Sequence, residues 1–503
     1  MILSDSKLMR RADETAINDF GIESARLMQN AAEHVAAARD IARRPEAYVF
    51  CSSGNNGGDG VGAAVCLLRA GFQVRVLLCG SRRKMSADTR EMERRLLELG
   101  GEVEDFDPKE YGLEEKLENT GVIIDAIFGI GLNREVTGPA LEAIRLINAS
   151  GAPVVSADIP SGVEADTGRI MGQAVRADVT VTFSMAKIGH FAEPGCTCCG
   201  RVEVRDIGIP RSVLEKCRTD THAMLDGEIR LPRRNPLSHK GDHGKVLIAG
   251  GCVGYTGAPT LCARAAVRSG AGLVYLAVPE RIYGVTAVKN DESMPFPLPC
   301  GEDGMFSAGG AELLLEKLRG CGVLAIGPGM GRGEGVVKMA LEVLRECDKP
   351  AVVDADGLYA LSRDMSVISQ RGSPLVLTPH EGEFARLGGT LGNGRVSAAR
   401  RFACDYNCTL VLKGHRTVVA FPDGEAYIST RGNAGMAKGG SGDVLTGIIA
   451  AMLGQFELKR AVKTAVFLHG LAGDLCREEK GEYAMTASDI IETLPRALKI
   501  LEE

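Results

Sequence analysis

The sequence predicts an α/β protein with two domains, each built on a parallel β-sheet that carries helices on its faces. Short apolar segments alternate with longer segments of helical periodicity through both halves of the chain. The length of 503 residues suits two to four domains at about 150 residues each. Glycine accounts for 63 residues, well above the usual share of about 7 %, and it clusters at strand-to-helix turns, where a backbone can approach a ligand.

Composition and charge exclude several classes of function. The net charge is −6 and the pI is near 5.9, which argues against a nucleic-acid-binding face. No apolar segment approaches the roughly 18 residues that would span a bilayer, and the N-terminus lacks the apolar core of a secretory signal. The 15 cysteines are scattered, several in apolar segments, as in proteins of a reducing compartment. We therefore expect a cytoplasmic protein without nucleic-acid or membrane partners.

The first half predicts a parallel sheet with helices on both faces. Apolar and alanine positions recur at helical spacing through the first 44 residues, and strands and helices then alternate. In such a sheet, binding residues gather beyond the C-terminal ends of the strands. The expected strands are Tyr48–Ser52, Gln73–Leu78, Val122–Ile127, Val154–Ala157, Asp178–Phe183 and an edge strand at Val202–Arg205.

Three oxygen-bearing side chains follow the ends of different strands in this half. Asn56, Asp125 and Ser161 each suit an ordinary turn, but together they favour a hard cation, which prefers oxygen ligands. The glycines after the first strand do not form the dinucleotide pattern G-x-G-x-x-G, and the second strand ends without an acidic residue for a ribose. This disfavours NAD as a hydride-carrying cofactor, although a nucleotide could still bind in another way.

Two groups of metal-type side chains lack the spacing of a metal site. The segment Cys196–Cys199 has no second C-x-x-C or histidine at zinc spacing, so we expect a turn before the edge strand. His239 and His243 are four residues apart, but Gly241 lies between them and argues against a helical metal pair.

Four motifs distinguish the first half: NNGGDG, DAIFGIGLNREVTGP, DIPSG followed by DTG, and DVTVTFSMAKIGH. With them, the chain from Met1 to about Pro210 resembles the NAD(P)H-hydrate epimerase domain. The resemblance implies a potassium ion at Asn56, Asp125 and Ser161, and a catalytic role for Asp158. It also implies that a hydrated nucleotide lies on Asn55, Asn56, Gly57, Gly58, Asp59, Gly129, Ile130, Gly131, Leu132, Asn133, Arg134, Glu135 and Asp158.

The boundary between the two domains is expected near residue 225. Residues 211–240 carry mixed charge and two prolines, Pro232 and Pro236, which is typical of a linker. This divides the chain into residues 1–225 and 226–503, which show no internal repeat. The strands expected in the second half are Lys245–Ala249, Leu273–Val278, Val323–Ile326, Ala351–Val353, Leu375–Leu377 and Thr409–Leu412.

The second half is organised around a glycine-rich stretch, Gly432–Met452. Its glycines permit sharp bends, and the apolar residues after Asp443 predict a buried helix. A glycine loop that leads into a helix N-terminus binds phosphate, and a carboxylate there can deprotonate a hydroxyl that attacks phosphorus. The simpler interpretation of Asp443 is an N-capping residue on a core helix. No G-x-x-x-x-G-K-[ST] motif is present, so this is not a P-loop enzyme, but Lys413 could meet phosphate oxygens as a point charge.

Seven ordered motifs span Leu231 to Leu501: SHKGD, GYTGAP, GPGMGRG, VVDADGL, LTPHEGEFARL, VLKGHRT and GNAGMAKGGSGDVLTGIIAAML. With them, this half resembles the ADP-dependent NAD(P)H-hydrate dehydratase, which has a ribokinase-like α/β fold, and it follows a Rossmann-like doubly wound first half. The resemblance implies ADP as co-substrate and magnesium as cofactor, in a homo-oligomer. It assigns contacts with the hydrated nucleotide to Ala258, Gly329, His380 and Asp443. It assigns contacts with the adenylate to Lys413, Gly414, His415, Arg416, Thr417 and Gly442.

Together the two resemblances imply a bifunctional repair enzyme. Water adds to the nicotinamide ring of NADH or NADPH and gives a hydrate with two epimers. The first half would interconvert the epimers, and the second would dehydrate the S epimer with ADP, giving AMP and phosphate. The alternative is a ribokinase-like kinase for a vitamin precursor, fused to a non-catalytic nucleotide-binding module. The products discriminate, because a kinase releases a stable phosphate ester and the dehydratase releases inorganic phosphate.

Overall fold

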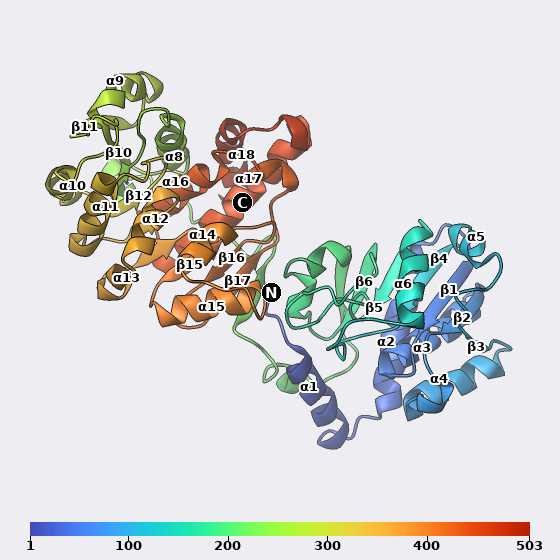
Figure 1. Ribbon diagram of the computed structural model, residues 1–503. Helices are drawn as coiled ribbons and strands as arrows, with labels where there is room; N and C mark the ends of the chain where they lie inside the picture. Colours follow the sequence, from blue (N-terminus) through green and yellow to red (C-terminus); the bar gives the residue numbers. More distant parts are fainter. Residues whose placement is uncertain (503) are drawn as a thin grey trace. The chain divides into compact units, whose positions relative to one another are not determined.

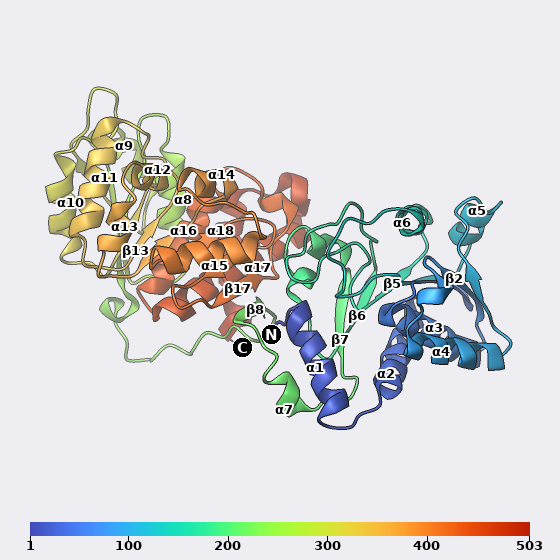
Figure 2. The same cartoon turned by 60° about the horizontal axis from the view of Figure 1, so that its bottom comes forward.

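The computed structural model describes residues 1–502, which form two compact units (Figure 1). One unit comprises Ile2–Thr221, and the other comprises the chain from His222 onwards together with Met1. The expected boundary at residue 225 lies just beyond this division. The reason is that strand β8 (Thr221–Met224) stands at the edge of the second sheet, beside β17 (Ala426–Ser429; Figure 2). No described helix is long and apolar enough to cross a bilayer.

The N-terminal unit is built on seven parallel strands in the order β3-β2-β1-β4-β5-β6-β7. The order reverses between β1 and β4, and sheets of this kind bind ligands in the crevice beyond such a point. Every expected strand is found to within two residues, and β3 is an additional short strand that the pattern did not indicate. The bounds are β1 Glu46–Cys51, β2 Gln73–Leu78, β3 Val103–Asp105, β4 Val122–Ala126, β5 Val154–Ala157, β6 Val179–Phe183 and β7 Arg201–Arg205.

Helices cover both faces of this sheet. Side chains alternate along β1, so Val49 and Cys51 join a core shared with α1–α4, while Tyr48 and Phe50 join a core shared with α5 and α6. The first 44 residues are not one continuous helix, because Gly21 adopts a left-handed φ of 67° between α1 and α2. The bounds are α1 Ser6–Asn18, α2 Ser24–Ala37, α3 Asn55–Arg69, α4 Ala87–Glu98, α5 Leu113–Glu118, α6 Pro139–Ala149 and α7 Arg211–Leu214.

The second unit is built on a ten-stranded sheet in the order β11-β10-β9-β12-β13-β14-β15-β16-β17-β8. Neighbours from β11 to β15 pair in parallel, and β16 and β17 then pair antiparallel. All six expected strands are present, but β8, β11, β16 and β17 were not expected. β11 contains Pro295 and Pro297, which strands tolerate only at sheet edges. The remaining bounds are β9 Lys245–Ala249, β10 Leu273–Pro279, β11 Met294–Leu298, β12 Val323–Ile326, β13 Ala351–Val353, β14 Leu375–Leu377, β15 Thr409–Leu412 and β16 Val418–Ala420.

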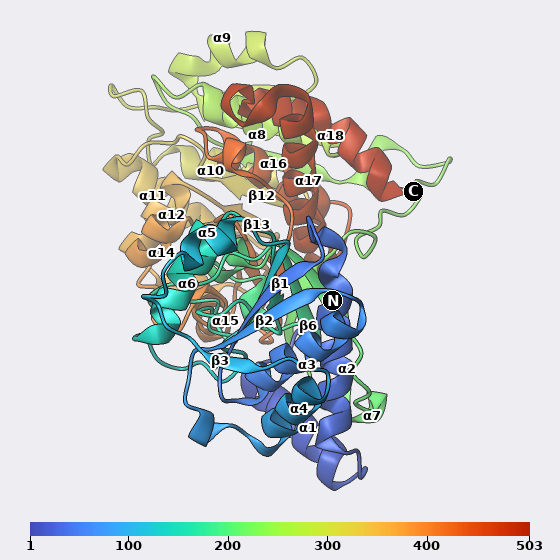
Figure 3. The ribbon, with the colours of Figure 1, turned by 90° about the vertical axis from the view of Figure 1, so that its right-hand side faces the viewer.

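One face of the second sheet carries a large apolar core shared with α8, α16, α17 and α18. Figure 3 shows α10, α11 and α12 on the other side of β12 and β13. The buried helix expected after Asp443 is confirmed as α16, which is buried from Val444 to Met452. The bounds are α8 Gly257–Arg268, α9 Glu280–Lys289, α10 Gly310–Leu318, α11 Glu334–Glu346, α12 Asp356–Arg363, α13 Ser366–Gln370, α14 Glu381–Arg386, α15 Arg395–Asp405, α16 Ser441–Leu453, α17 Leu458–Ala484 and α18 Ala487–Glu502.

Two candidate active sites

Most residues expected to hold a nucleotide in the N-terminal unit line one cleft of ≈ 590 Å³. The cleft lies beyond the ends of β1 and β4, where the strand order reverses. Gly57 and Gly58 are buried behind it, and Glu135 is exposed outside its wall. The expected residues in the wall are Asn55, Asn56, Asp59, Gly129, Ile130, Gly131, Leu132, Asn133, Arg134 and Asp158.

Helix α3 directs its N-terminus toward this cleft. The turn from β1 to α3 is tight, and a Cβ on Gly57 would lie 1.8 Å from the carbonyl oxygen of Ser52, so only glycine fits there. The N-cap residue is Gly54, and no side chain caps the helix. The first backbone N–H groups of α3 are therefore available to an anion, which the helix dipole also favours.

Asp125, near the end of β4, is fully buried among hydrogen-bond donors. Its Oδ2 accepts from Ser156 Oγ at 2.7 Å and from the Ser161 amide at 2.8 Å, and its Oδ1 accepts from Ser161 Oγ at 2.5 Å. Burial raises the pKa of Asp125, although these hydrogen bonds favour the ionised form. A cation beside such a carboxylate would offset the cost of burying its charge.

Asn56 approaches the same region from the start of α3. A Cβ on Gly129 would lie 3.0 Å from Asn56 Oδ1, and the Phe128 amide donates to Ser161 Oγ at 2.8 Å, so both side chains meet the loop after β4. Asn56 Nδ2 is buried without a partner among the described residues. The structure thus brings Asp125 and Ser161 into direct contact and places Asn56 on the adjoining loop. Together they offer carboxylate, hydroxyl and amide oxygens, the ligand types that hard cations prefer.

Asp158 follows β5 and forms a buried ion pair with Lys187. Lys187 Nζ lies 2.5 Å from Asp158 Oδ1 and also donates to Thr182 Oγ1 at 2.8 Å. Burial opposes ionisation of Asp158, but the Lys187 ammonium overcomes it and holds the pKa of Asp158 below its usual range. Asp158 also has a left-handed φ of 64°, unusual for a residue other than glycine and typical of functional positions.

In the second unit, the glycine-rich stretch leads into the N-terminus of α16. Gly440 is the N-cap, with a left-handed φ of 96°, and no side chain caps the helix. The Ser441 amide donates to the Lys438 carbonyl at 3.3 Å, so the next N–H groups of the first turn are the ones available to an anion. Ser441 Oγ is also buried without a partner among the described residues.

Asp443 lies in the first turn of α16 but does not cap it, which contradicts the simpler interpretation of this residue. Among the described residues its carboxylate has no hydrogen bond or ion pair. Burial, followed by repulsion from Asp354, raises the pKa of Asp443 to about 7. A carboxyl group with such a pKa can accept or release a proton near neutral pH.

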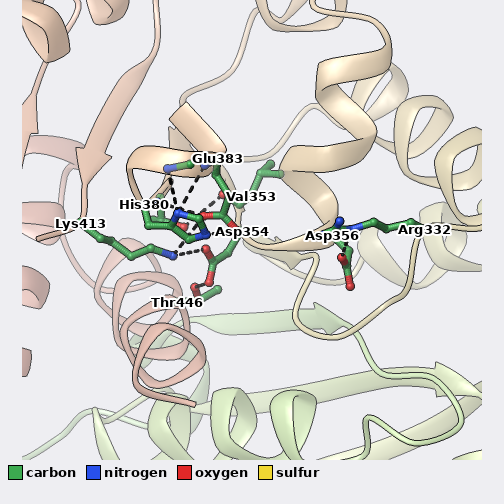
Figure 4. Close-up of polar contacts among 10 residues, drawn as sticks. Arg332, Val353, Asp354, Asp356, His380, Glu383, Lys413 and Thr446 are labelled. Carbon is green, nitrogen blue, oxygen red and sulfur yellow. Dashed lines mark hydrogen bonds and ion pairs between the residues drawn. The ribbon is translucent and has the colours of Figure 1, made fainter. Parts of the chain in front are cut away.

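Figure 4 shows an ion pair between Lys413, at the end of β15, and Asp354, at the end of β13. The Nζ–Oδ1 distance is 2.7 Å, and Thr446 of α16 donates to Asp354 Oδ2 at 2.8 Å. Burial opposes ionisation of Asp354, but Lys413 holds its pKa below the usual range. A Cβ on Gly442 would lie 3.4 Å from Lys413 Nζ, so the ammonium is beside the first turn of α16.

His380 begins α14 and lies near the same ion pair (Figure 4). Its Nδ1 accepts from the Gly382 amide at 3.0 Å, and Glu383 Oε2 accepts from the His380 amide at 2.9 Å. The His380 side chain is 60 % exposed, which confirms the expectation that it is not a core histidine. Glu383 is largely buried, with its Oε2 3.7 Å from Lys413 Nζ.

The other residues expected at this site fall into two groups. Ala258, in the first turn of α8, is close to Gly329, because a Cβ on Gly329 would lie 3.1 Å from the Ala258 Cβ. The segment from Lys413 to Thr417 connects β15 to β16, and Gly414 and His415 in it are exposed. Lys438, in the glycine-rich stretch, instead donates to the carbonyl oxygens of residues 483 and 485.

Sequence reasoning did not assign Lys187 or Asp354 to a site. Both lie within the quoted motifs, DVTVTFSMAKIGH and VVDADGL, and both follow the end of a parallel strand. Their position beyond a strand end was the available signal. What it could not indicate is that each pairs with an opposite charge that is far away in the chain.

The cysteines of Cys196–Cys199 and the pair His239 and His243, which lack the spacing of a metal site, make local contacts. Cys196 and Cys198 lie in a 3₁₀ turn, Gly195–Cys198, and Cys199 follows it just before β7, as expected. His239 Nδ1 accepts from the Gly241 amide at 3.1 Å, and His243 bonds to Ser238 Oγ at 2.9 Å. Across residues 1–502, no three His, Cys, Asp or Glu side chains group in a way that could hold a metal ion.

Comparison with known proteins matches both units to described families. The family described as "YjeF-related protein N-terminus" matches residues 24–189, and the family described as "NAD(P)H-hydrate dehydratase" matches residues 246–496. Among solved structures, a ribokinase-like superfamily protein from Enterococcus faecalis superposes with a TM-score of 0.50 at 28 % identity. That match covers 56 % of this chain and 98 % of the other.

Two curated relatives match over nearly their whole length. Both are named bifunctional NAD(P)H-hydrate repair enzyme Nnr. The one from Thermofilum pendens is 40 % identical over 100 % of this chain and 96 % of its own, and the one from Moorella thermoacetica is 41 % identical over 100 % and 98 %. The chain therefore belongs to the family of bifunctional NAD(P)H-hydrate repair enzymes.

Proposed function

We propose that the N-terminal unit epimerises the hydrates of NADH and NADPH, and that the second unit dehydrates the S epimer with ADP. The observation that carries the second activity is Asp443, a half-buried carboxylate without a partner among the described residues, at a helix N-terminus that no side chain caps. The family membership of both halves supports the pairing of the two reactions in one chain. It also favours repair over the alternative of a vitamin-precursor kinase with a non-catalytic partner module.

The dehydration proceeds in two steps through this site. The ring hydroxyl attacks the terminal phosphorus of ADP; an O–P bond forms, the bond to AMP breaks, and Asp443 takes the hydroxyl proton. The phosphate then leaves with the C–O bond electrons, and the neighbouring ring carbon gives a proton to solvent, which restores the reduced nicotinamide. The α16 N–H groups and Lys413 would hold the transferred phosphoryl group, because helix N-termini and ammonium groups stabilise its charge.

The pKa of Asp443 suits the role of general base. A base acts best when its pKa is near the working pH, and burial raises the pKa of Asp443 to about 7. Asp354 is less suited, because Lys413 donates to its Oδ1 and Thr446 donates to its Oδ2, so neither carboxylate oxygen is free to take a proton. Asp354 would instead position the Lys413 ammonium.

In the epimerase half, Asn56, Asp125 and Ser161 fit a potassium ion. They supply three kinds of oxygen, and the Asn56 amide nitrogen lacks a partner, which leaves this side chain free to turn its oxygen toward a ligand. Potassium would neutralise the buried Asp125 carboxylate and fix the loops that carry Phe128 and Ser161.

In the dehydratase half, magnesium would accompany the nucleotide phosphates. Magnesium usually keeps several waters and takes one or two carboxylates besides phosphate. Glu383 would be the carboxylate available to it, since Asp354 is committed to its ion pair and Asp443 acts as the base. When bound, the ion would neutralise charge on the transferred phosphoryl group.

Incubation of the purified protein with each separated hydrate epimer, with ADP, ATP or no nucleotide, tests the proposal. We expect interconversion of the epimers without nucleotide, and recovery of reduced-nicotinamide absorbance with release of AMP and inorganic phosphate when ADP is present. Accumulation of a stable phosphate ester would instead indicate the kinase. Failure to interconvert the epimers would remove the epimerase assignment.

A further inference from the structure

The nucleotide cleft of the N-terminal unit adjoins a smaller cavity of ≈ 130 Å³. The two are adjacent, because their linings share six residues: Asp13, Asn55, Asp59, Ile130, Asp158 and Phe183. Its size is of the order needed for one six-membered ring, since an engineered cavity of about 150 Å³ accepts benzene. The carboxyl groups in its lining belong to Asp13, Asp59, Asp88 and Asp158.

Asp13 reaches this cavity from α1, an element that the motifs of the site do not include. The helix buries Met9, Ala12 and Ala16 in the core, and Asp5 caps its N-terminus. Asp13 is therefore neither a core residue nor the helix cap. Asp13 also lines the larger cleft, and among the described residues it has no hydrogen bond or ion pair. A carboxyl group held in a cavity without a partner costs stability, and a function is the usual reason for it.

The acidic groups of the cavity differ in their partners. Asp158 is ion-paired with Lys187, and Asp88 accepts a hydrogen bond from Ser24 Oγ at 2.9 Å. Asp59 is only 9 % exposed and, like Asp13, has no hydrogen bond or ion pair among the described residues. The site therefore holds one carboxylate fixed by a cation and two carboxyl groups without one.

The surroundings of these carboxyl groups shift their pKa values in opposite directions, up for Asp13 and Asp59 and down for Asp158. Burial raises the pKa of Asp13 to about 6 and that of Asp59 well above its usual value. The charged groups that act on Asp13 are Lys187, which lowers its pKa, and Asp158 and Glu14, which raise it. Pairs of titratable groups with pKa values driven apart are typical of an acid and a base in one active site.

We propose that Asp13 is a catalytic residue of the epimerase, which donates a proton to the ring hydroxyl of the hydrate while Asp158 accepts a proton from the incoming water. The proposal rests on the epimerase activity proposed above. It adds a residue from α1 to a site otherwise built from strand ends.

The chemistry balances without a redox step. The hydroxyl is on the ring carbon next to nitrogen, because water adds to the enamine at that carbon. Asp13 gives its proton to the hydroxyl, the C–O bond breaks with its electron pair on oxygen, and water leaves while the nitrogen lone pair forms an iminium. Water then adds to the other face of that carbon, a new C–O bond forms, and Asp158 takes the proton. Proton exchange with solvent returns both groups to their initial states.

The test compares Asp13→Asn with Glu14→Gln, a change of the adjacent and exposed carboxyl group on the same helix. We expect Asp13→Asn to lower kcat for epimerisation by about a hundred-fold or more, the usual scale for loss of a general acid, with little change in KM. Glu14→Gln should keep most of the wild-type rate, because Glu14 is the smallest of the influences on Asp13, and dehydration of the pure S epimer should be normal in both variants. An Asp13→Asn variant with a rate near that of the wild type overturns the proposal.

Two further measurements keep the proposal testable if Asp13→Asn does not fold. In the wild type, epimerisation should slow as the pH rises above about 6, because Asp13 then loses the proton it donates; a rate that does not fall in this range overturns the proposal. In water enriched in ¹⁸O, each epimerisation should place one solvent oxygen on the ring. Epimerisation without labelling would exclude loss of the hydroxyl and with it the role of Asp13. A wild type that does not epimerise at all would instead refute the proposed function itself.

Discussion

Lys413 Nζ lies 2.7 Å from Asp354 Oδ1, which joins the ends of β15 and β13 directly beneath the start of α16. Glu383 is 3.7 Å from the same ammonium, and Asp443 also acts on it. Lys413 is therefore surrounded by carboxylates and already has one fixed partner. Its side chain is 20 % exposed and that of Asp354 is 2 % exposed, so the pair is buried on one side and reachable on the other.

This pair gives Lys413 both a structural and a binding role. Lys413→Ala should weaken ADP binding by roughly ten- to a hundred-fold, the scale of a lost charge-assisted contact, and should weaken binding of the hydrate less. It should also lower the free energy of unfolding by about 3–5 kcal/mol, because Asp354 would be left buried without its cation. Calorimetric titration and denaturant unfolding measure the two effects.

The double variant Lys413→Ala/Asp354→Asn separates these roles. It removes the uncompensated carboxylate and should recover much of the lost stability, but ADP binding should stay weak. Equal weakening of ADP and hydrate binding in the single variant would contradict the assignment of Lys413 to the phosphates.

Asp443→Asn tests the general base. Asparagine has nearly the same shape but cannot take the proton, and no capping bond is lost, since Asp443 makes none. Dehydration should fall by about a hundred-fold or more, while ADP binding is nearly unchanged. Epimerisation by the same preparation is the internal control, because that site belongs to the other unit. Near-normal dehydration would show that Asp443 is not the base.

The pH dependence of dehydration and of stability in the wild type should also reflect the ionisation of Asp443. The pKa of Asp443 is raised from 3.8 to about 7, so the base is ionised only above that pH and the dehydration rate should rise as the pH increases through 7. Unfolding releases this proton between about pH 4 and 7, so the contribution of Asp443 to stability falls over that window as the pH rises. Both trends should be absent in Asp443→Asn.

The strand ends of both units could be predicted, but their long-range partners could not. The periodicity of apolar residues located β1, β4, β9 and β13, and the glycines after them indicated ligand sites. The β16–β17 hairpin and the edge strands β8 and β11 were not predicted, because they are short and depend on tertiary pairing.

Within the sites, the sequence motifs predicted which loop residues take part, but they did not predict the ion pairs and charged neighbours of those residues. Asp125 and Ser161 are 36 residues apart, yet their hydrogen bond follows from the parallel order of β4 and β5. The pairing of Lys187 with Asp158, and the arrival of Asp13 from α1, depend on how helices pack over the sheet. No local pattern encodes that packing, so these groups required the structure.

Asp125→Ala tests the potassium site. Loss of this carboxylate should slow epimerisation and abolish its dependence on potassium, because the main charge opposite the ion is removed. Ser156→Ala is the matched control, since Ser156 Oγ bonds to Asp125 but is not one of the three expected ligands. Titration of the epimerisation rate with potassium chloride, at constant ionic strength with sodium, measures both. An unchanged potassium response in Asp125→Ala would contradict the site.

Two fragments of the second half, one with and one without strand β8, test whether the two halves fold separately. We propose that each half folds alone, because each has its own sheet and core. A fragment that starts at Asp226 lacks β8, whose Ala223 and Met224 are buried, and with it the hydrogen bond from Thr430 Oγ1 to the Met224 carbonyl at 2.6 Å.

A fragment that starts at His222 keeps all of that strand except Thr221, and it keeps the stacking of His222 on Tyr427, whose ring centroids are 4.6 Å apart. Burial of one methionine side chain contributes about 1.5–3 kcal/mol, so the Tm of the His222 fragment should exceed that of the Asp226 fragment by several degrees. Both should dehydrate the S epimer, because the Lys413–Asp354 pair and Asp443 lie in the retained part. Equal Tm values would show that β8 adds nothing to the second sheet. Loss of activity in both fragments, with an active full-length chain, would show that the second half depends on the first.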